Sequence, residues 1–460
     1  ADSSPGLKQL WLQQYWLLRE EQHLSDASPM AATLAATPRV AVVGGGLAGS
    51  LCALVLRSRG LEPLVFEANR RRVGGRLAGT VQNAGDVGVQ FLRSTDPGSQ
   101  FAQALRLFEQ NGLVAPWKGR FGVLGARSGG FLPREIIRES QFASMARAGG
   151  AIDDSEVQQA SSSDFCGFIT GESNTSATYV GTPSMDSVCE GVCSMASIAV
   201  RHDARVTDLD LEFDTARSAW NVSTDGAHVG SFDAVVLATQ DPSLAASVVQ
   251  RVARRLEEEG PLVVDMPIGP RLLAMAQALR ELRDHRAPAV AMSAWFEAGA
   301  VSSRVPFDGV SCPTSRHIQF VARDASKPGR PRVGIDGREL WTAVSTIGYG
   351  RELLNGVAED DTKTVAVEME RRLANLFAPF FGGDALSVPA AARVTIELWR
   401  EAFVTKSLGL KEDCISLEPC RLAVCGDFLR DYPSPAEAAA VSGMEAGERL
   451  ASWFAGAGPE

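Results

Sequence analysis

Hydrophobic and polar positions first become regular near residue 39, where a strand, a glycine turn and a helix follow one another. Residues 39–43 (RVAVV) are a short run of the kind found in buried strands, and the glycine-rich stretch 44–49 follows directly. Apolar positions then recur with helical spacing over 48–59. A second strand-like run covers 63–67. This succession predicts a βαβ unit of about thirty residues.

Later parts of the chain repeat both kinds of pattern. Period-two or continuous apolar runs predict strands at 206–213, 219–224, 231–238, 316–322, 340–345 and 421–425. Helical spacing predicts helices at 244–259, 271–283, 361–376 and 435–454. Together with the βαβ start, this mixture predicts an α/β fold with a Rossmann-type domain and a mixed α+β domain.

The N-terminal segment differs from the rest. Residues 4–24 have apolar side chains around most of a helical circumference. These side chains include Leu10, Trp11, Tyr15 and Trp16. Such a helix needs burial on more than one side, so we expect it to dock on its own protein, on a protein partner or on a membrane surface. The stretch 25–38 has linker composition, and we treat 1–38 as a helix and linker.

Composition narrows the classes of function. The chain has 460 residues and a net charge of −10, which favours more than one domain and argues against nucleic-acid binding. Its 8 cysteines and 5 histidines lack metal-ligand spacing, so we expect no metal site and a reducing compartment. The longest uncharged stretch, 40–56, is interrupted by glycines, so no transmembrane span is expected. Because the first residue is Ala, a processed N-terminus and a plastid or mitochondrial location are compatible with the sequence.

The glycine turn has the pattern G-x-G-x-x-G. Gly44 permits a tight turn, Gly46 lets the backbone approach a pyrophosphate, and Gly49 lets the helix pack closely on the sheet. The phosphates are then expected at the helix N-terminus, next to Leu47 and Ala48.

An acid ends the second strand of the unit. Glu67 is placed to accept hydrogen bonds from both hydroxyls of an adenosine ribose, and its charge would repel a 2′-phosphate. Soon afterwards Gly74, Gly75 and Arg76 suit a second close approach to a pyrophosphate, with the guanidinium neutralising charge. The stretch 86–91 (DVGVQF) contains a further close-packed glycine turn.

A second phosphate-binding glycine motif after the ribose acid is typical of flavin sites. With these motifs the sequence resembles the FAD-dependent amine oxidase superfamily. Within it, the chain is most similar to the renalase-like oxidoreductases. The similar stretches are 179–185, 320–330, 398–400 and 425–427.

The resemblance implies a glutathione-reductase-type FAD domain built from 39–125, 179–245 and 419–460. It implies a substrate domain, with an insertion, built from 126–178 and 246–418. Further residues for FAD follow from the same resemblance. Val206 would meet the adenine through its backbone, Gly426 and Asp427 would hold the ribityl or pyrophosphate part, and the last helix would point its N-terminus at the flavin ring.

Three departures from the family pattern fall on the substrate side. Glu437-Ala438-Ala439 stands where a glycine is common near the start of the last helix, and their Cβ atoms would narrow the approach to the flavin. Val344 replaces a histidine, and Glu401 replaces an aromatic residue.

The activity implied by the resemblance is oxidation of a reduced nicotinamide-type or amine small molecule, with hydride transfer to flavin and reoxidation by oxygen. The sequence identifies no catalytic residue. Arg323, Lys327 and Arg400 are candidates to meet a phosphate-bearing substrate. The alternative is an accessory subunit of a larger, organellar complex that retains FAD without turnover.

Overall fold

The computed structural model describes residues 37–78, 85–125, 130–134, 144–145, 177–213, 218–258, 268–330, 336–355, 361–432 and 434–455. The predicted N-terminal helix with Leu10, Trp11, Tyr15 and Trp16 lies outside these ranges, as does most of the predicted insertion. None of the helices in these ranges combines the length and the hydropathy needed to span a lipid bilayer.

The predicted βαβ unit is confirmed. Strand β1 spans Arg39–Val43, helix α2 spans Leu47–Ser58 and β2 spans Glu62–Phe66. The two strands pair in parallel, with Val43 opposite Phe66. Val40 and Val42 pack on one side of the sheet, whereas the alternate residues Ala41 and Val43 pack on the other. Both faces of the unit are therefore covered, which explains the continuous hydrophobic run.

The unit sits in a six-stranded sheet of order β17-β18-β11-β1-β2-β7. The added strands are β17 (Ile415–Leu417), β18 (Leu422–Val424), β11 (Ala234–Leu237) and β7 (Ala199–Arg201). All pairs are parallel except that of β17 with β18. The strand expected at 231–238 is in fact two strands, because Ser231 and Phe232 belong to β10 (Ala227–Phe232) and pair with β9.

A three-stranded antiparallel sheet and a helix pair cover one face of this sheet. The sheet has the order β10-β9-β8, with β8 at Val206–Phe213 and β9 at Ser218–Thr224. Helices α7 (Ser243–Glu258) and α8 (Ile268–Glu281) pack on each other. Their apolar residues join the same core as those of β8 and β9.

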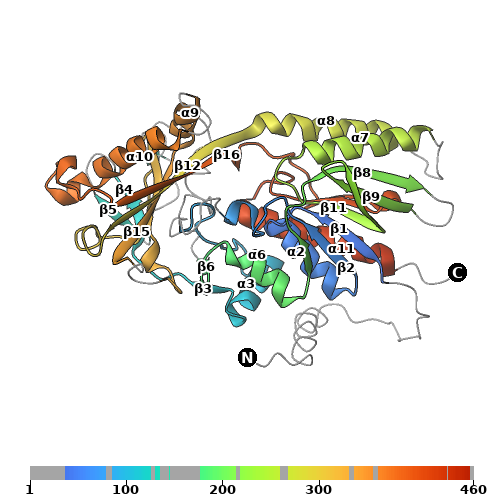
Figure 1. Cartoon of the computed structure of the whole chain (residues 1–460), viewed down its shortest axis with the longest axis horizontal. Helices are drawn as coiled ribbons and strands as arrows, with labels where there is room; N and C mark the ends of the chain where they lie inside the picture. The colour runs from blue at the N-terminus through green and yellow to red at the C-terminus, as the bar shows by residue number, and fades with distance from the viewer. Residues whose placement is uncertain are drawn as a thin grey trace.

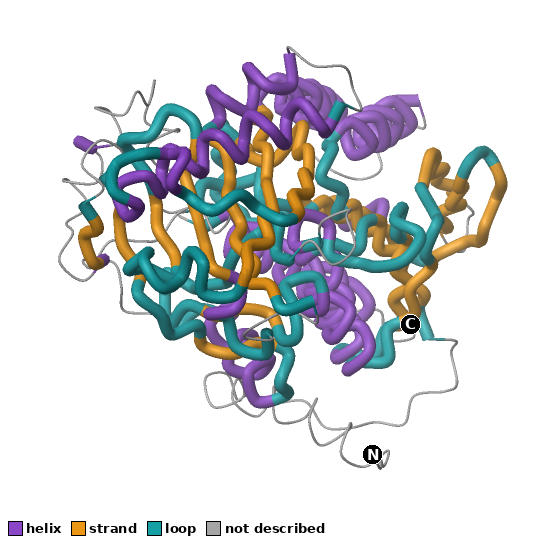
Figure 2. The backbone as a smooth tube through the Cα atoms, turned by 60° about the vertical axis from the view of Figure 1, so that its left-hand side comes forward, coloured by secondary structure: helices purple, strands orange, loops and turns teal. Residues whose placement is uncertain are grey.

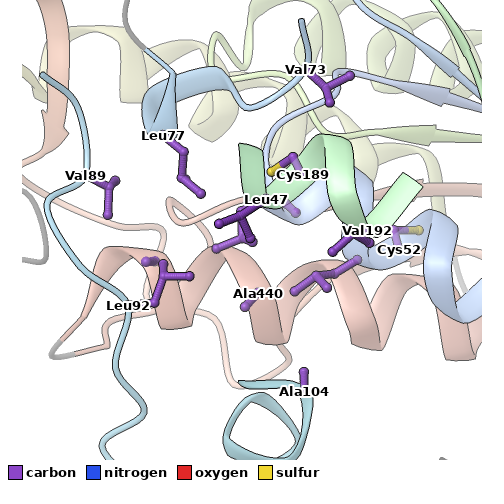
Figure 3. Close-up of a cluster of buried hydrophobic side chains, with 14 of the residues drawn as sticks. Leu47, Cys52, Val73, Leu77, Val89, Leu92, Ala104, Cys189, Val192 and Ala440 are labelled. Atoms are coloured by element: carbon purple, nitrogen blue, oxygen red, sulfur yellow. The ribbon is translucent and has the colours of Figure 1, made fainter. Parts of the chain in front are cut away.

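The opposite face carries α2 and the last helix, α11 (Pro435–Ala455), in close contact. A Cβ added at Gly443 would lie 2.1 Å from the Ala48 carbonyl oxygen, and one at Gly447 would lie 3.0 Å from that of Cys52. Figure 3 shows this core, to which α3 (Gln100–Gln110) and α6 (Ser187–Met195) also contribute. The short strands β3 (Val114–Pro116) and β6 (Tyr179–Gly181) pair beside it.

The second part of the molecule is built on a seven-stranded sheet of order β16-β12-β15-β14-β13-β4-β5. Its strands are β4 (Phe121–Leu124), β5 (Phe131–Pro133), β12 (Arg286–Glu297), β13 (Gly309–Ser311), β14 (Ile318–Arg323), β15 (Arg338–Ser345) and β16 (Arg393–Val404). Strand β4 thus pairs in this sheet with β13 and β5, although 39–125 was expected to belong wholly to the other domain.

Helices α9 (Ile347–Asn355) and α10 (Thr362–Phe377) cover one face of this sheet (Figure 2). Val290 and Met292 point into that core, whereas Ala289 and Ala291 point into the core shared with α2 and α11. Strands β12 and β16 run from this sheet towards the Rossmann part (Figure 1). The predicted fold class is therefore confirmed, and the division into domains by residue number stays a prediction.

Candidate functional site: a dinucleotide-type cavity

A cavity of about 590 Å³ lies where β1, β2 and β11 end at their carboxyl sides. Its walls come from the glycine turn after β1, the second glycine motif, the start of β8, the end of β16 and the first turns of α11. The crevice outside the carboxyl ends of parallel strands is where open α/β sheets bind ligands. The volume lies within the range of cofactor pockets.

Each glycine of the first motif meets a different constraint. Gly44 has a φ of 108°, and a Cβ there would lie 2.6 Å from the Ala238 carbonyl oxygen. A Cβ on Gly49 would lie 1.9 Å from the Gly44 carbonyl oxygen, so helix α2 packs against the turn only with glycine at that position. Gly46 lacks such a neighbour, because its Cβ would approach nothing closer than 4.0 Å.

The second glycine motif lies face to face with the first. The Gly74 N–H donates to the Gly45 carbonyl oxygen at 2.8 Å, and a Cβ on Gly75 would lie 3.3 Å from the Gly46 Cα. Gly46 and Gly75 both line the cavity. Because Gly46 and Gly75 have no side chains, the two facing segments leave space in the cavity that Cβ atoms would otherwise occupy.

Glu67 lines the cavity at the end of β2. Its Oε2 accepts from the Gly45 N–H at 3.0 Å, and its Oε1 accepts from the Asn69 N–H at 2.7 Å. Each carboxylate oxygen has two lone pairs, so both can accept a further hydrogen bond. The structure thus holds this carboxylate rigidly next to the first glycine motif.

A buried ion pair joins the second motif to the C-terminal region. Arg76 Nη2 lies 2.7 Å from Asp427 Oδ1, and Arg76 Nη1 donates to the Ala402 carbonyl oxygen at 3.1 Å. Burial by itself would raise the pKa of Asp427, but Arg76 and Arg286 outweigh it and hold that pKa below its ordinary value. Asp427 Oδ2 is buried without a hydrogen-bond partner, which marks an acceptor that a ligand or a moved guanidinium could satisfy.

Arg286 does not line the cavity, but its charge acts on Asp427, and the sequence did not reveal this neighbour. Its Nη2 donates to the Gln240 carbonyl oxygen at 2.6 Å, while its Nε and Nη1 are buried without partners. Burial lowers the pKa of Arg286, and the Asp427 carboxylate opposes that effect. No local motif surrounds Arg286, which begins strand β12, so only the tertiary fold brings it to the ion pair.

Most of the predicted cofactor residues come together. Those that line the cavity are Gly44, Gly46, Leu47, Ala48, Glu67, Gly75, Arg76, Val206, Gly426 and Asp427. Gly49 does not line the cavity, but it allows helix α2 to pack against the glycine turn that does. Their individual roles towards a ligand stay predictions.

The charged substrate candidates are located elsewhere. Lys327 is 2% exposed and its Nζ lies 2.7 Å from Asp86 Oδ2. Arg323 Nη2 lies 2.7 Å from Asp308 Oδ1. Neither they nor Arg400 line the cavity. The expectation that this group meets a substrate phosphate therefore has no support, because two of the three cations pair with buried carboxylates.

The three sequence departures have distinct positions. Ala436 and Ala439 line the cavity, whereas Glu437 is turned away from it and is 1% exposed. Val344 is fully buried in the core between the two sheets. Glu401 lines the cavity beside Ala402. Of the predicted group, Ala439 is therefore the residue that lines the cavity, and the narrowing of the approach to the flavin stays a prediction.

Comparison with known proteins supports a Rossmann-type domain at the first glycine motif. Residues 42–108 match the NAD(P)-binding Rossmann-like domain family. A stretch of 92 residues is 36% identical to the tRNA 5-methylaminomethyl-2-thiouridine biosynthesis bifunctional protein MnmC of Caulobacter sp. (strain K31), covering 20% of this chain and 15% of that protein. A stretch of 61 residues is 46% identical to protoporphyrinogen oxidase 2, chloroplastic/mitochondrial, of Arabidopsis thaliana, covering 13% and 12%. The matches thus span less than a sixth of either relative.

Solved structures resemble the whole architecture. Cyclohexylamine oxidase from Brevibacterium oxydans superposes with a TM-score of 0.56 at 12% identity, covering 91% of this chain and all of that one. An oxidoreductase from Methanosarcina mazei gives 0.53 at 15% identity, covering 89% and 100%. Putrescine oxidase bound to putrescine gives 0.52 at 15% identity, covering 90% and 98%. The chain therefore contains a dinucleotide-type Rossmann domain and has the fold of these oxidases.

Proposed function

We propose that the chain binds FAD and is an oxidoreductase of the renalase-like type. The observation that carries the proposal is a single cavity that combines two facing glycine motifs, the Glu67 carboxylate and the Arg76–Asp427 ion pair. The fold shared with the oxidases supports it, and so does the match to a Rossmann-like family. When bound, FAD supplies the redox chemistry, accepting a hydride and passing electrons to oxygen.

In this proposal the chain's own residues bind and orient the cofactor. Gly44 and Gly46 accommodate the pyrophosphate at the N-terminus of α2, where free N–H groups favour an anion. Glu67 accepts hydrogen bonds from the adenosine ribose, and the Val206 backbone contacts the adenine. Asp427 holds the ribityl part through its free oxygen while Arg76 neutralises phosphate charge.

We further propose a small reduced nicotinamide-type substrate, with an amine as the alternative. The far part of the cavity is walled by Val89, Ala402 and Phe403, with Glu401 beside them. Among the described residues that line the cavity there is neither a lysine nor a tyrosine. Hydride transfer from a dihydronicotinamide needs no protein base, so these apolar walls suit it.

Two measurements test the proposal. Purified protein is expected to be yellow and to release flavin on heating. Anaerobic mixing with NADH, NADPH, their isomers, putrescine or cyclohexylamine should bleach the absorbance near 450 nm with at least one of them. A colourless chain that takes up no added FAD refutes the cofactor. A flavin that stays oxidised with every donor favours the accessory-subunit alternative.

A further inference from the structure

The buried carboxylate of Glu437 belongs to the first turn of α11. Its Oε1 accepts from the Ser94 hydroxyl at 2.7 Å. Its Oε2 accepts from the Thr95 N–H at 2.9 Å and from the Thr95 hydroxyl at 2.6 Å. Among the described residues these hydrogen-bond partners are all neutral. The carboxylate is therefore well solvated by dipoles, but none of the described residues in contact with it is a cation that would cancel its charge.

The same turn forms part of the cavity wall. Pro435, Ala436 and Ala439 line the cavity, and Glu437 follows Ala436 directly. Gly443 packs on Ala48. The first residue of α11, Pro435, is eight positions earlier, so the N-terminus of the helix lies about 12 Å along its axis from that contact.

If FAD binds as proposed, this end of α11 lies next to its redox-active half. In Figure 3, Leu77 and Val89 lie on the side of Leu47 towards which α11 extends, and both line the cavity. If the sugar of the dinucleotide is at Glu67 and its phosphates are at Gly46, the flavin ring lies at this end. The placement of the ring rests on the proposed function.

We propose that the negative charge of Glu437 lowers the reduction potential of the bound flavin. Reduction adds negative charge to the ring, and the N-terminus of a helix, equivalent to about half a positive charge, favours that change. A full negative charge held in the same turn opposes it, with little screening because the residue is buried. A flavin at lower potential accepts hydride only from a strong donor, which fits a reduced nicotinamide better than a simple amine.

The test is the midpoint potential of the FAD-loaded protein, measured by equilibration with a reference dye during anaerobic reduction. Glu437→Gln keeps the hydrogen-bonding shape and removes the charge. We expect the equilibrium between oxidised and reduced flavin to shift roughly tenfold towards the reduced form, which is about 30 mV for two electrons. Thr95→Lys, at a partly exposed position, brings an ammonium to the same carboxylate and should shift the potential in the same direction.

Matched variants separate charge from structure. Glu445→Gln removes a carboxylate from the same helix that pairs with Arg449 at 2.7 Å, and it should leave the potential unchanged. Glu437→Asp keeps the charge and should have the same midpoint potential as the wild type. If the wild-type protein binds FAD but neither Glu437→Gln nor Thr95→Lys raises its potential, this inference is overturned alone. If wild-type protein binds no FAD, the inference falls together with the proposed cofactor.

Discussion

Replacing Gly49 or Gly46 of the first glycine motif by alanine is expected to affect different properties of the protein. At Gly49 the new Cβ would lie 1.9 Å from the Gly44 carbonyl oxygen, well inside van der Waals contact, and a backbone carbonyl cannot rotate away. At Gly46 the nearest atom would be 4.0 Å away, and the backbone there has an ordinary φ of −73°. The first variant therefore strains the fold, and the second mainly fills ligand space.

The magnitudes follow from this geometry. Overpacking costs about 3 kcal/mol, and alanine returns about 1 kcal/mol through helix propensity, so Gly49→Ala should lose about 2 kcal/mol of unfolding free energy. Gly46→Ala, at an N-cap, should lose about 0.5–1 kcal/mol. Its methyl group occupies the space proposed for a phosphate, so FAD affinity should fall roughly 100-fold, or about 2.7 kcal/mol.

The assays are urea unfolding of the cofactor-free variants and titration with FAD followed by flavin fluorescence. The reasoning fails if Gly46→Ala binds FAD as tightly as the wild type. It also fails if the two variants lose the same unfolding free energy, because the structure gives only Gly49 a backbone clash. Gly348→Ala in α9 is the matched control, because that helical glycine has no positive φ and no atom within 4 Å of its Cβ position.

Three more outcomes are expected. Asp427→Asn should cost about 2 kcal/mol, because a neutral amide replaces the carboxylate that pairs with Arg76. Because the folded pKa of Asp427 is lowered, the contribution of its charge is present above pH ~4 and lost as the pH falls, so acid unfolding of the variant should be less steep. Lys327→Met should lower the unfolding free energy by about 2 kcal/mol through the lost charge-assisted hydrogen bond to Asp86, which keeps Arg330 as its other cationic partner. The FAD titration should be unchanged, and altered turnover with unchanged stability would contradict the structural role. Glu67→Ala should weaken FAD roughly tenfold, measured by the same titration, by removing hydrogen bonds to the ribose.

The sequence predicted those parts of the site whose geometry is local. The turn at Gly44 and Gly46 and the acid Glu67 belong to one βαβ unit, so strand, turn and helix signals lie side by side. The second glycine motif follows within ten residues of Glu67. Local patterns of this kind predict the backbone conformation without any knowledge of tertiary contacts.

The remaining parts depend on contacts between distant segments. Arg76 binds the carbonyl oxygen of a residue 326 positions away, and the position of Arg286 depends on how β12 reaches Gln240. Lys327 was named as a cation that could meet a substrate phosphate, whereas the fold buries it against Asp86. A single sequence shows neither partner nor burial.

The close contact between α11 and α2 has a consequence during synthesis. Helix α2 is among the first described elements made, yet the groove that receives Gly443 stays open until α11 leaves the ribosome. At 5–20 residues per second that interval is about 20–80 seconds. A nascent chain therefore exposes apolar surface on α2 for much of its translation. The first glycine motif and the cavity wall formed by α11 can come together only at the last stage.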